Sequence, residues 1–467
     1  MPKYRTETDS IGNIDLPANC LFGIQTERAR RNFPITGVPL SQFPNLVIAL
    51  AMVKSAAAQA NGELGGISSA KARAIVDACD EIIEGQHHEH FVVDMIQGGA
   101  GTSTNMNTNE VVANLALRKL GHPAGTYSQL HPNDDVNHGQ STNDVYPTAV
   151  RLAVLFQVAP LCLALSRLRA AFEDRARAFA TITKVGRTQL QDAVPVTLGA
   201  EFRAFAVTVG EDIDRINEIG RFLKEVNLGG TAIGTRVNSE AGYDARAIFH
   251  LARISGFDLR QASDLVEASS DLGAFVTFSG ILKRVAVKLS KICNDLRLLS
   301  SGPRAGLGEI ALPAVQAGSS IMPGKVNPVI PEVVNQVCYQ VIGNDLTVTM
   351  AAEAGQLQLN AMEPVVTYNL LNSLMILTNS INVLTEKCVL GIKADADRCA
   401  ALLDNSLILA TALAPHLGYD AAARLAKQAL ESGKSIRDVT VESGLVPAEK
   451  LDSILSASTM ADQEAFS

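Results

Sequence analysis

The sequence of 467 residues contains no tryptophan, and aromatic residues make up only 5% of it. Strands draw on aromatic and β-branched residues, whereas helices favour Ala and Leu, which are abundant here. Hydrophobic residues account for 47% and charged residues for 19%, as is typical of a folded globular protein. The composition therefore predicts a mainly helical chain with a large buried core.

Three further absences disfavour whole classes of protein. The formal net charge is -8 and the Lys and Arg residues are scattered, so the chain lacks the basic stripe that binds nucleic acid. The seven cysteines are widely spaced without a C-x-x-C pair, which disfavours a disulfide framework or a zinc site. The N-terminus is polar, and no uninterrupted apolar run is long enough to span a bilayer. We expect a cytoplasmic protein that binds neither nucleic acid nor membrane.

The spacing of apolar residues changes along the chain. Up to residue 140, Gly, Pro and Asn separate short helical segments. Over 141–392, apolar residues recur in alternating steps of four and three, which predicts long helices packed nearly parallel. Val287 and Met375 lie outside these seams, which favours burial of a second helix face in an oligomer. Residues 393–467 have shorter helical patterns and are expected to form a small C-terminal domain.

The most informative segment is GSSIMPGKVNP, residues 318–328, which directly precedes a helical pattern. Backbone N–H groups, Lys325 and Asn327 at a helix entrance would make a receptor for a carboxylate. A Walker A phosphate loop does not fit, because Gly318 and Gly324 enclose five residues instead of four and Val326 replaces the magnesium-binding hydroxyl. From the residues alone, an anion site and an ordinary Gly/Pro turn remain equally open.

Two other polar segments lie upstream, GGAGTSTN at 98–105 and QSTND at 140–144. Taken singly, the first is a glycine-rich loop without the strand that a dinucleotide site needs, and the second is a helix N-cap. All three segments, in this order, resemble the conserved blocks of the aspartase/fumarase superfamily of lyases. The similarity extends from about Tyr4 to at least Gly444. The chain is therefore identified as a member of that superfamily.

The resemblance implies an all-α, three-domain fold with a central long-helix bundle. The expected domains are an N-terminal domain with catalytic loops (1–140), the central helical bundle (141–392) and a small C-terminal helical domain (393–467). It also implies a homotetramer whose active sites are each shared by three subunits. The substrate would be a small dicarboxylate, and neither a cofactor nor a catalytic metal is expected.

Several blocks are similar to the ammonia-lyases of the superfamily more than to its fumarases, among them residues 22–29, 186–192, 300–304 and 328–345. Gln189 stands where fumarases typically carry His, and Gln can bond an amine but cannot act as a general base. The expected activity is reversible anti-elimination of ammonia from L-aspartate to give fumarate through an aci-carboxylate intermediate. Fumarate hydration or a lyase reaction on another substituted succinate is the alternative. A non-catalytic helical scaffold is disfavoured by the intact polar segments.

The resemblance also implies roles for single residues. Ser319 is the expected base, which removes the proton from the carbon next to the β-carboxylate. The expected substrate-binding residues are Thr102, Ser141, Thr142 and Ser320 for the β-carboxylate and its aci form, Thr188, Lys325 and Asn327 for the α-carboxylate, and Asn143 and Gln189 for the amino group.

Some polar residues fall outside this assignment. His87, His88 and His90 are clustered but form no HExxH pattern, so a solvated helix end is expected rather than a metal site. His131 lies in a segment that resembles the secondary anion-binding region of the superfamily. Two positions depart from the superfamily pattern, Gly139 in place of Ser or Cys and Arg236 in place of Gly. Arg236 would alter substrate choice if its loop faces the active site.

Overall fold

The computed structural model describes residues 4–318 and 320–455. Helices predominate among them, and their strands are short and pair only two at a time. The chain divides into two compact units. The first comprises Met1–Cys162, Asp214–Arg284 and Tyr339–Leu377, and the second comprises Leu163–Ile213, Val285–Cys338 and Thr378–Ser467. The predicted all-α fold is confirmed, whereas the division into three domains stays a prediction.

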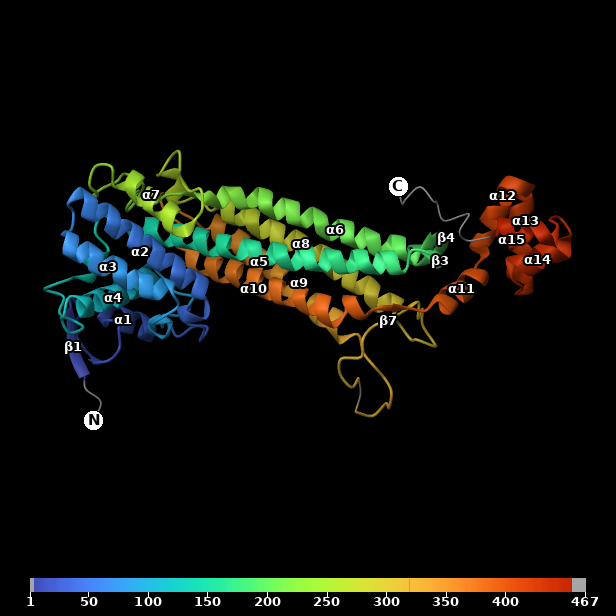
Figure 1. Cartoon of the computed structure of the whole chain (residues 1–467), viewed down its shortest axis with the longest axis horizontal. Coiled ribbons are helices and arrows are strands. Elements are labelled where there is room, and N and C mark those ends of the chain that lie inside the picture. Colours follow the sequence, from blue (N-terminus) through green and yellow to red (C-terminus); the bar gives the residue numbers. More distant parts are fainter. Residues whose placement is uncertain (1–3, 319, 456–467) are drawn as a thin grey trace. The chain divides into compact units, whose positions relative to one another are not determined.

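Five long helices contribute segments to both units. They are α5 (Thr142–Ala178), α6 (Leu198–Gly220), α8 (Gly273–Leu299), α9 (Val329–Glu353) and α10 (Glu363–Lys387). Within each unit these segments lie side by side (Figure 1). Their predicted seams are buried, for example Leu289 on α8 and Leu374 on α10. The near-heptad spacing therefore did identify the bundle helices.

Contacts between these helices combine aromatic packing with polar pairs. In the second unit, the Phe172 ring on α5 lies 6.1 and 5.6 Å from the Phe202 and Phe205 rings on α6. In the first unit, Asn344 Nδ2 on α9 donates to Ser373 Oγ on α10 at 2.9 Å. Because buried polar groups need partners, such pairs fix the register of one helix against the next.

Helix α5 is long and apolar enough to cross a membrane by length and composition, with a mean hydropathy of 1.9 in its most apolar window. However, 61% of that window is buried inside the protein. Burial of this extent is typical of the core helix of a soluble bundle, which passes the same test.

The first unit also contains shorter elements outside these long helices. They are β1 (Tyr4–Asp9), β2 (Gly12–Pro17), α1 (Ile24–Asn32), η1 (Leu40–Gln42), α2 (Pro44–Leu64), α3 (Ser69–Ile83), η2 (His88–His90), α4 (Thr102–Lys119), η3 (Pro132–Val136), η4 (Arg221–Lys224), β5 (Glu225–Val226), α7 (Tyr243–Ser255), β6 (Arg260–Gln261) and η5 (Glu267–Ser269). Helix α2 packs against α3 and α7, and α4 packs against α1 and α3. β1 pairs with β2 in antiparallel fashion, whereas β5 and β6 are parallel.

The second unit adds a hairpin and a C-terminal group of short helices. Its elements are β3 (Thr183–Thr188), β4 (Gln191–Thr197), β7 (Ile310–Ala311), η6 (Val389–Gly391), β8 (Lys393–Ala394), α11 (Ala396–Asp404), η7 (Leu407–Leu409), α12 (Ala410–Leu417), α13 (Tyr419–Ser432), α14 (Ile436–Ser443) and α15 (Ala448–Ile454). The short helices share a small apolar core that includes Leu413, Leu425 and Val439. β3 pairs with β4 and β7 with β8, both in antiparallel fashion.

The start of α1 is fixed by a buried carboxylate from another helix. Glu110 on α4 accepts hydrogen bonds from the backbone N–H groups of Gly23, Gln25 and Thr26 at 2.8, 2.8 and 3.1 Å, and from the Thr26 hydroxyl. A Cβ on Gly23 would lie 2.7 Å from the carboxylate carbon of Glu110, so a larger residue there would displace this carboxylate. Burial raises the pKa of Glu110 to about 7, against the lowering effect of these hydrogen bonds. The sequence FGIQTERA at residues 22–29 therefore has a structural explanation.

Replacing Glu110 with alanine is expected to destabilise the fold by about 3 kcal/mol, because the first-turn N–H groups of α1 lose their buried acceptor. Thermal melting of the purified variant measures the loss. Glu89→Ala is the matched control, since that side chain is 70% exposed. Equal melting temperatures for the two variants would contradict the assigned role.

Candidate active site

Polar side chains from two loops meet where α4 and α5 begin. Thr102 is the first residue of α4, and its hydroxyl donates to the Gly99 carbonyl at 2.7 Å. Asn105 Nδ2 donates to Thr142 Oγ1 at 3.2 Å and to Asn137 Oδ1 at 3.1 Å. Thr102 is exposed, whereas Thr142 is buried. The structure therefore brings the segments 98–105 and 140–144 into direct contact.

A buried aspartate holds a third loop against this cluster. Asp144 accepts hydrogen bonds from the backbone N–H groups of Ser141, Gly229 and Thr231 at 2.9, 2.9 and 3.1 Å. Complete burial raises its pKa to about 6, even though these bonds favour the carboxylate. The loop that follows β5 is thereby fixed next to residues 141–144.

Asn143 is held in place from two sides. Its Nδ2 donates to the Ala232 carbonyl at 2.7 Å, and its own carbonyl accepts from Asn227 Nδ2 at 2.9 Å. The side chain is half-buried, and its Oδ1 remains an acceptor directed by these bonds. The neighbouring Ser141 hydroxyl accepts from the Asn143 backbone N–H at 3.2 Å. These contacts preorganise two of the predicted substrate-binding residues.

Beneath the cluster lies Lys54, which sequence reasoning missed. Its ammonium group is buried on α2 and donates to Asn137 Oδ1 at 2.8 Å and to Gln140 Oε1 at 2.9 Å. Burial lowers its pKa to about 7. The signal in the sequence was a single lysine within the apolar helical run of residues 44–58, where a charge needs a buried partner.

In the second unit, Thr188 and Gln189 lie at the tip of the β3–β4 hairpin. Thr188 pairs with Gln191, so Gln189 and Leu190 form a two-residue turn. Both have left-handed backbone conformations, with φ of 54° and 62°. Turns of this kind favour Gly and Asn, and larger residues cost about 1–2 kcal/mol there. This strained turn exposes the Gln189 side chain to solvent.

A buried ionic cluster fixes the base of this hairpin. The fully buried Glu309 lies 3.1 Å from Lys184 Nζ and accepts from Arg187 Nη1 at 2.8 Å. Lys184 also lies 3.1 Å from Glu201. Because Arg187 directly precedes Thr188, the cluster sets the direction in which the hairpin tip projects.

The segment GSSIMPGKVNP forms a loop closed at its base and ends directly before α9. Asn327 Nδ2 donates to the Gly318 carbonyl at 2.7 Å. A Cβ on Gly318 would lie 2.1 Å from the Lys325 carbonyl oxygen, so only glycine fits there. Ser320 and Lys325 are exposed along the loop. Ser319, the predicted base, lies outside the described residues.

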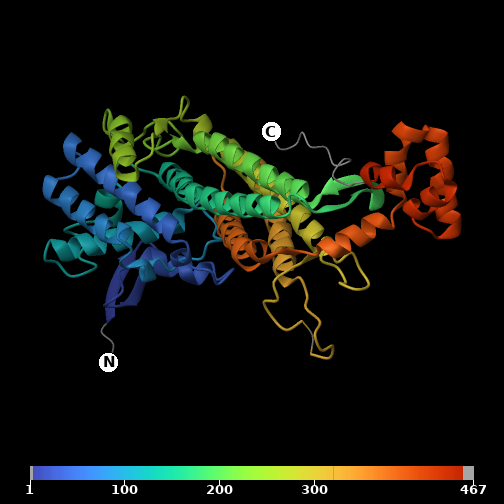
Figure 2. The same cartoon turned by 45° about the vertical axis from the view of Figure 1, so that its right-hand side comes forward.

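The predicted site residues thus occupy three places in one chain. Thr102, Ser141, Thr142 and Asn143 gather in the first unit. The second unit holds the other two places, the hairpin tip with Thr188 and Gln189 and the loop with Ser320, Lys325 and Asn327. The hairpin and the loop stand apart in both views of the chain (Figures 1 and 2). Within the second unit of a single chain, the residues of the hairpin tip and those of the loop are therefore not brought together.

The histidines have separate partners. His87 Nε2 lies 2.9 Å from Glu81, and His88 Nε2 lies 2.8 Å from the Ile82 carbonyl. His131 Nδ1 accepts from the backbone N–H groups of Asn133 and Asp134 and so caps η3. Over residues 4–318 and 320–455, no group of three His, Cys, Asp or Glu side chains is placed to hold a metal ion.

Comparison with known families shows to which family the chain belongs. Residues 12–343 match the lyase family model, and residues 409–462 match the C-terminal family of fumarase C. The chain belongs to the aspartase/fumarase lyases. The resemblance seen in the three polar segments is thereby confirmed.

Individual relatives of this lyase cover nearly its whole length. An aspartate ammonia-lyase from Pseudomonas canavaninivorans is 57% identical over 98% of this chain and 97% of its own. A fumarate lyase:delta crystallin from Brucella melitensis, solved with cobalt bound, is 60% identical, with a TM-score of 0.96 over 98% of this chain and 100% of that one. A class II fumarase from Schistosoma mansoni is 36% identical, with a TM-score of 0.92 over 98% and 99%.

Arg236, the main departure of this lyase from the superfamily pattern, turns toward another residue of its own loop region. Its Nε donates to Asp244 Oδ2 at 2.7 Å, and its side chain remains 51% exposed. Its φ of 60° is the left-handed conformation that favours the glycine expected at this position. The loop borders Asn143, but the charge of Arg236 is directed to Asp244.

Arg236→Gly is therefore expected to change kcat/KM less than about threefold and stability less than about 1 kcal/mol, since an exposed ion pair is worth little and glycine relieves the backbone. Steady-state kinetics on aspartate, together with a melting curve, measures both. A tenfold or larger shift in substrate preference would show that the arginine does reach the substrate.

Proposed function

We propose that this chain is an aspartate ammonia-lyase, which reversibly eliminates ammonia from L-aspartate in the anti sense to give fumarate. The observation that carries the proposal is the 57% identity to an aspartate ammonia-lyase over almost the whole of both chains. Gln189 at the exposed hairpin tip supports it, because a glutamine can bind an amine but cannot activate water as a base.

The proposed chemistry begins with removal of a proton from the carbon next to the β-carboxylate. Ser319 takes that proton as an oxyanion, activated by loop N–H groups and a nearby cation, because a free serine hydroxyl is too weak a base. The electron pair moves into the β-carboxylate and forms the doubly charged aci form. Thr102, Ser141, Thr142 and Ser320 donate hydrogen bonds to it where the charge develops, and the Thr102 hydroxyl leaves the Gly99 carbonyl to do so.

The intermediate then collapses to products. The electron pair returns to form the carbon–carbon double bond, the carbon–nitrogen bond breaks, and the nitrogen leaves with its electron pair. Asn143 suits the amino group, because its Nδ2 already donates to Ala232 and leaves Oδ1 to accept. Lys325, Asn327 and Thr188 hold the α-carboxylate through a charge and three donors. No step requires a cofactor.

We further propose that a homotetramer assembles each site from three subunits. The separation of the hairpin from the 318–327 loop in Figures 1 and 2 supports this, since both carry proposed contacts to one small substrate. Helix α9 also presents an apolar stripe, with Tyr339, Leu346 and Met350 exposed by 58%, 61% and 65%. Such a stripe is typical of a surface that another subunit covers. A cytoplasmic location is part of the same proposal, because the cysteine pattern suits a reducing compartment.

Fumarate hydration is the second candidate, favoured by the 36% identity to a class II fumarase. One assay separates the two: fumarate absorbance is followed after mixing with enzyme, with and without ammonium. The ammonia-lyase consumes fumarate only when ammonium is present. Consumption without ammonium would establish a hydratase, and no consumption in either mixture would indicate another substituted succinate.

A further inference from the structure

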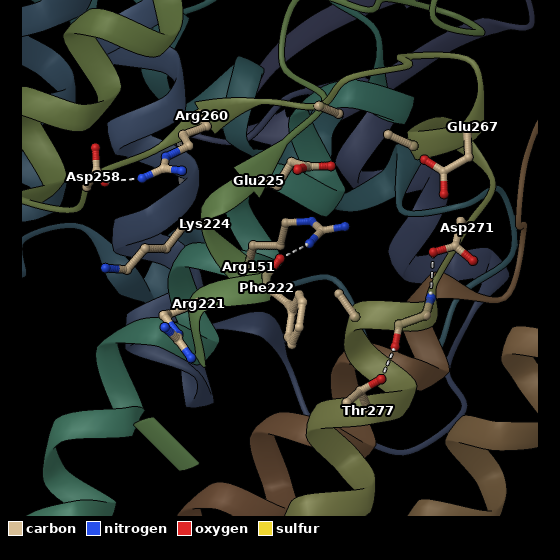
Figure 3. A pocket seen from close by; sticks show the side chains of 14 residues that line it. Arg151, Arg221, Phe222, Lys224, Glu225, Asp258, Arg260, Glu267, Asp271 and Thr277 are labelled. Carbon is tan, nitrogen blue, oxygen red and sulfur yellow. Dashed lines mark hydrogen bonds and ion pairs between the residues drawn. The ribbon is translucent and has the colours of Figure 1, made fainter. Parts of the chain in front are cut away.

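A pocket of about 620 Å³ opens in the first unit (Figure 3). It lies between η4–β5, β6 with its flanking residues, η5 and the start of α8, with Arg151 of α5 among its lining residues. None of the described residues predicted to bind substrate lines it. The proposed reaction therefore leaves this pocket without a role.

The charged side chains of the pocket are partly separated by sign. Arg221, Lys224 and Arg260 lie on one side of Arg151 in Figure 3, Glu267 and Asp271 lie on the other, and Glu225 lies beside Arg151 between them. Asp258 on the basic side pairs with Arg260 at 3.1 Å, but both side chains are about three-quarters exposed, so this pair holds little energy. The pocket is thus a dipole, basic at one end and acidic at the other.

Arg151 is the buried element of this site. Arg151 is only 8% exposed, and its guanidinium carbon lies 5.1 Å from the centroid of the Phe275 ring in a cation–π interaction. Among the described residues, its guanidinium donates one direct hydrogen bond, to the Phe222 carbonyl at 3.1 Å, and forms no ion pair. Burial lowers its pKa, against the raising effect of Glu363, Glu225 and Asp271. A guanidinium has five donors, so this one retains capacity for a ligand.

At the acidic end of the pocket, several carboxylates lie near one another. The pKa of Glu267 is raised by burial and by the neighbouring carboxylates of Asp271 and Glu225. Asp271 Oδ2 accepts from the Gly273 N–H at the start of α8, which leaves its other oxygen open. A cationic group placed here would relieve the repulsion between the carboxylates.

The size and the apolar surface of the pocket restrict the choice of ligand further. A pocket of this volume suits a molecule larger than a single amino acid. The Phe222 side chain is 59% exposed and lines the pocket between the charged ends (Figure 3). We propose that this pocket binds a short zwitterionic peptide, with its carboxylate toward Arg221 and Lys224, its ammonium toward Glu267 and Asp271, and an apolar side chain on Phe222.

The pocket is connected to the predicted site through β5. Glu225 lines the pocket, and Asn227, two residues later, donates to the Asn143 carbonyl at 2.9 Å. Occupation of the pocket is therefore expected to change the KM for aspartate more than kcat. That effect on KM rests on the proposed function, whereas binding of the peptide does not.

Titration calorimetry of the full-length protein with alanyl-phenylalanine tests the binding. The free dipeptide binds, and blocking either its amino or its carboxyl end weakens binding about tenfold, which corresponds to about 1.4 kcal/mol. Free phenylalanine, which cannot reach both ends, binds at least about tenfold more weakly than the dipeptide. Saturating fumarate does not compete with the peptide, because the two ligands occupy different places, and it shifts the peptide's affinity by no more than the coupling through β5 that changes KM.

Arg221→Ala and Glu267→Gln are each expected to weaken dipeptide binding about tenfold. Arg246→Ala, an equally charged and half-exposed residue that pairs with Glu63 outside the pocket, leaves it unchanged. The proposal is overturned if the free dipeptide gives no binding, if capped peptides or phenylalanine bind as tightly, if the two pocket variants match Arg246→Ala, or if fumarate displaces the peptide.

Discussion

Replacing Ser319 with alanine is expected to lower kcat for aspartate by about 10²–10⁴-fold, the range over which a positioned general base contributes. The proton next to the β-carboxylate has no other proposed acceptor. The remaining donors to the carboxylates persist, so KM changes far less than kcat. Steady-state kinetics in both directions, on aspartate and on fumarate with ammonium, would show the same loss, because one base serves both.

The fold of this variant has to stay intact for the result to bear on chemistry. The neighbouring residues Gly318 and Ser320 belong to no helix or strand, so the melting temperature and far-ultraviolet circular dichroism should match those of the parent. Ser128→Ala, which alters an exposed turn of the first unit, is the control and should keep full activity. Near-normal turnover by the Ser319 variant would remove it from the role of base.

The bundle helices could be read from the sequence because their signal is local. Leu370, Leu374, Leu377, Ile381 and Leu384 repeat at helical spacing, and all five are buried on α10. A seam of this kind identifies the helix and the face that it buries without knowledge of its neighbours.

The β3–β4 hairpin could not be read in this way. Its turn residues, Gln189 and Leu190, are poor choices for a left-handed two-residue turn, so the usual Asn-Gly or Gly-containing signal is missing. Strand pairing and the ionic cluster at the hairpin's base impose the conformation instead. Tertiary contacts overrule local preference here, and sequence patterns do not contain them.

The residues of the candidate site also divide into those that the sequence revealed and those that it did not. Resemblance located the loops that carry Thr102, Asn143 and Lys325, because their composition is unusual. The residues that hold those loops, Lys54 and Glu309, escaped notice, because each is an ordinary charged residue whose burial depends on distant partners. Lys54 acquires its importance from Asn137 and Gln140, more than eighty residues away in the sequence.

Replacing Glu309 with alanine is expected to destabilise the protein by about 3–5 kcal/mol, because it leaves buried cations without their counter-charge. Lys184 is 1% exposed and Arg187 is 14% exposed, so water cannot take the place of the lost carboxylate. Glu309 directly precedes β7, on the way to the 318–327 loop, and Arg187 directly precedes Thr188. The same residue therefore ties the base of the hairpin to the segment that leads to the 318–327 loop.

Two further variants separate the effect of burying the ion pair from the effect of its charge. Glu386→Ala removes an equally short ion pair, 2.8 Å from Arg167, but both of its side chains are about half exposed. It should cost no more than about 1 kcal/mol. Glu309→Gln keeps the volume and one acceptor oxygen, so it should fall between the two in chemical denaturation or melting experiments. If Glu309→Ala and Glu386→Ala proved equally mild, the buried cluster would not be what orients the hairpin. Loss of the Glu309 carboxylate should also raise KM for aspartate, because Thr188 and Gln189 would no longer be held in one direction.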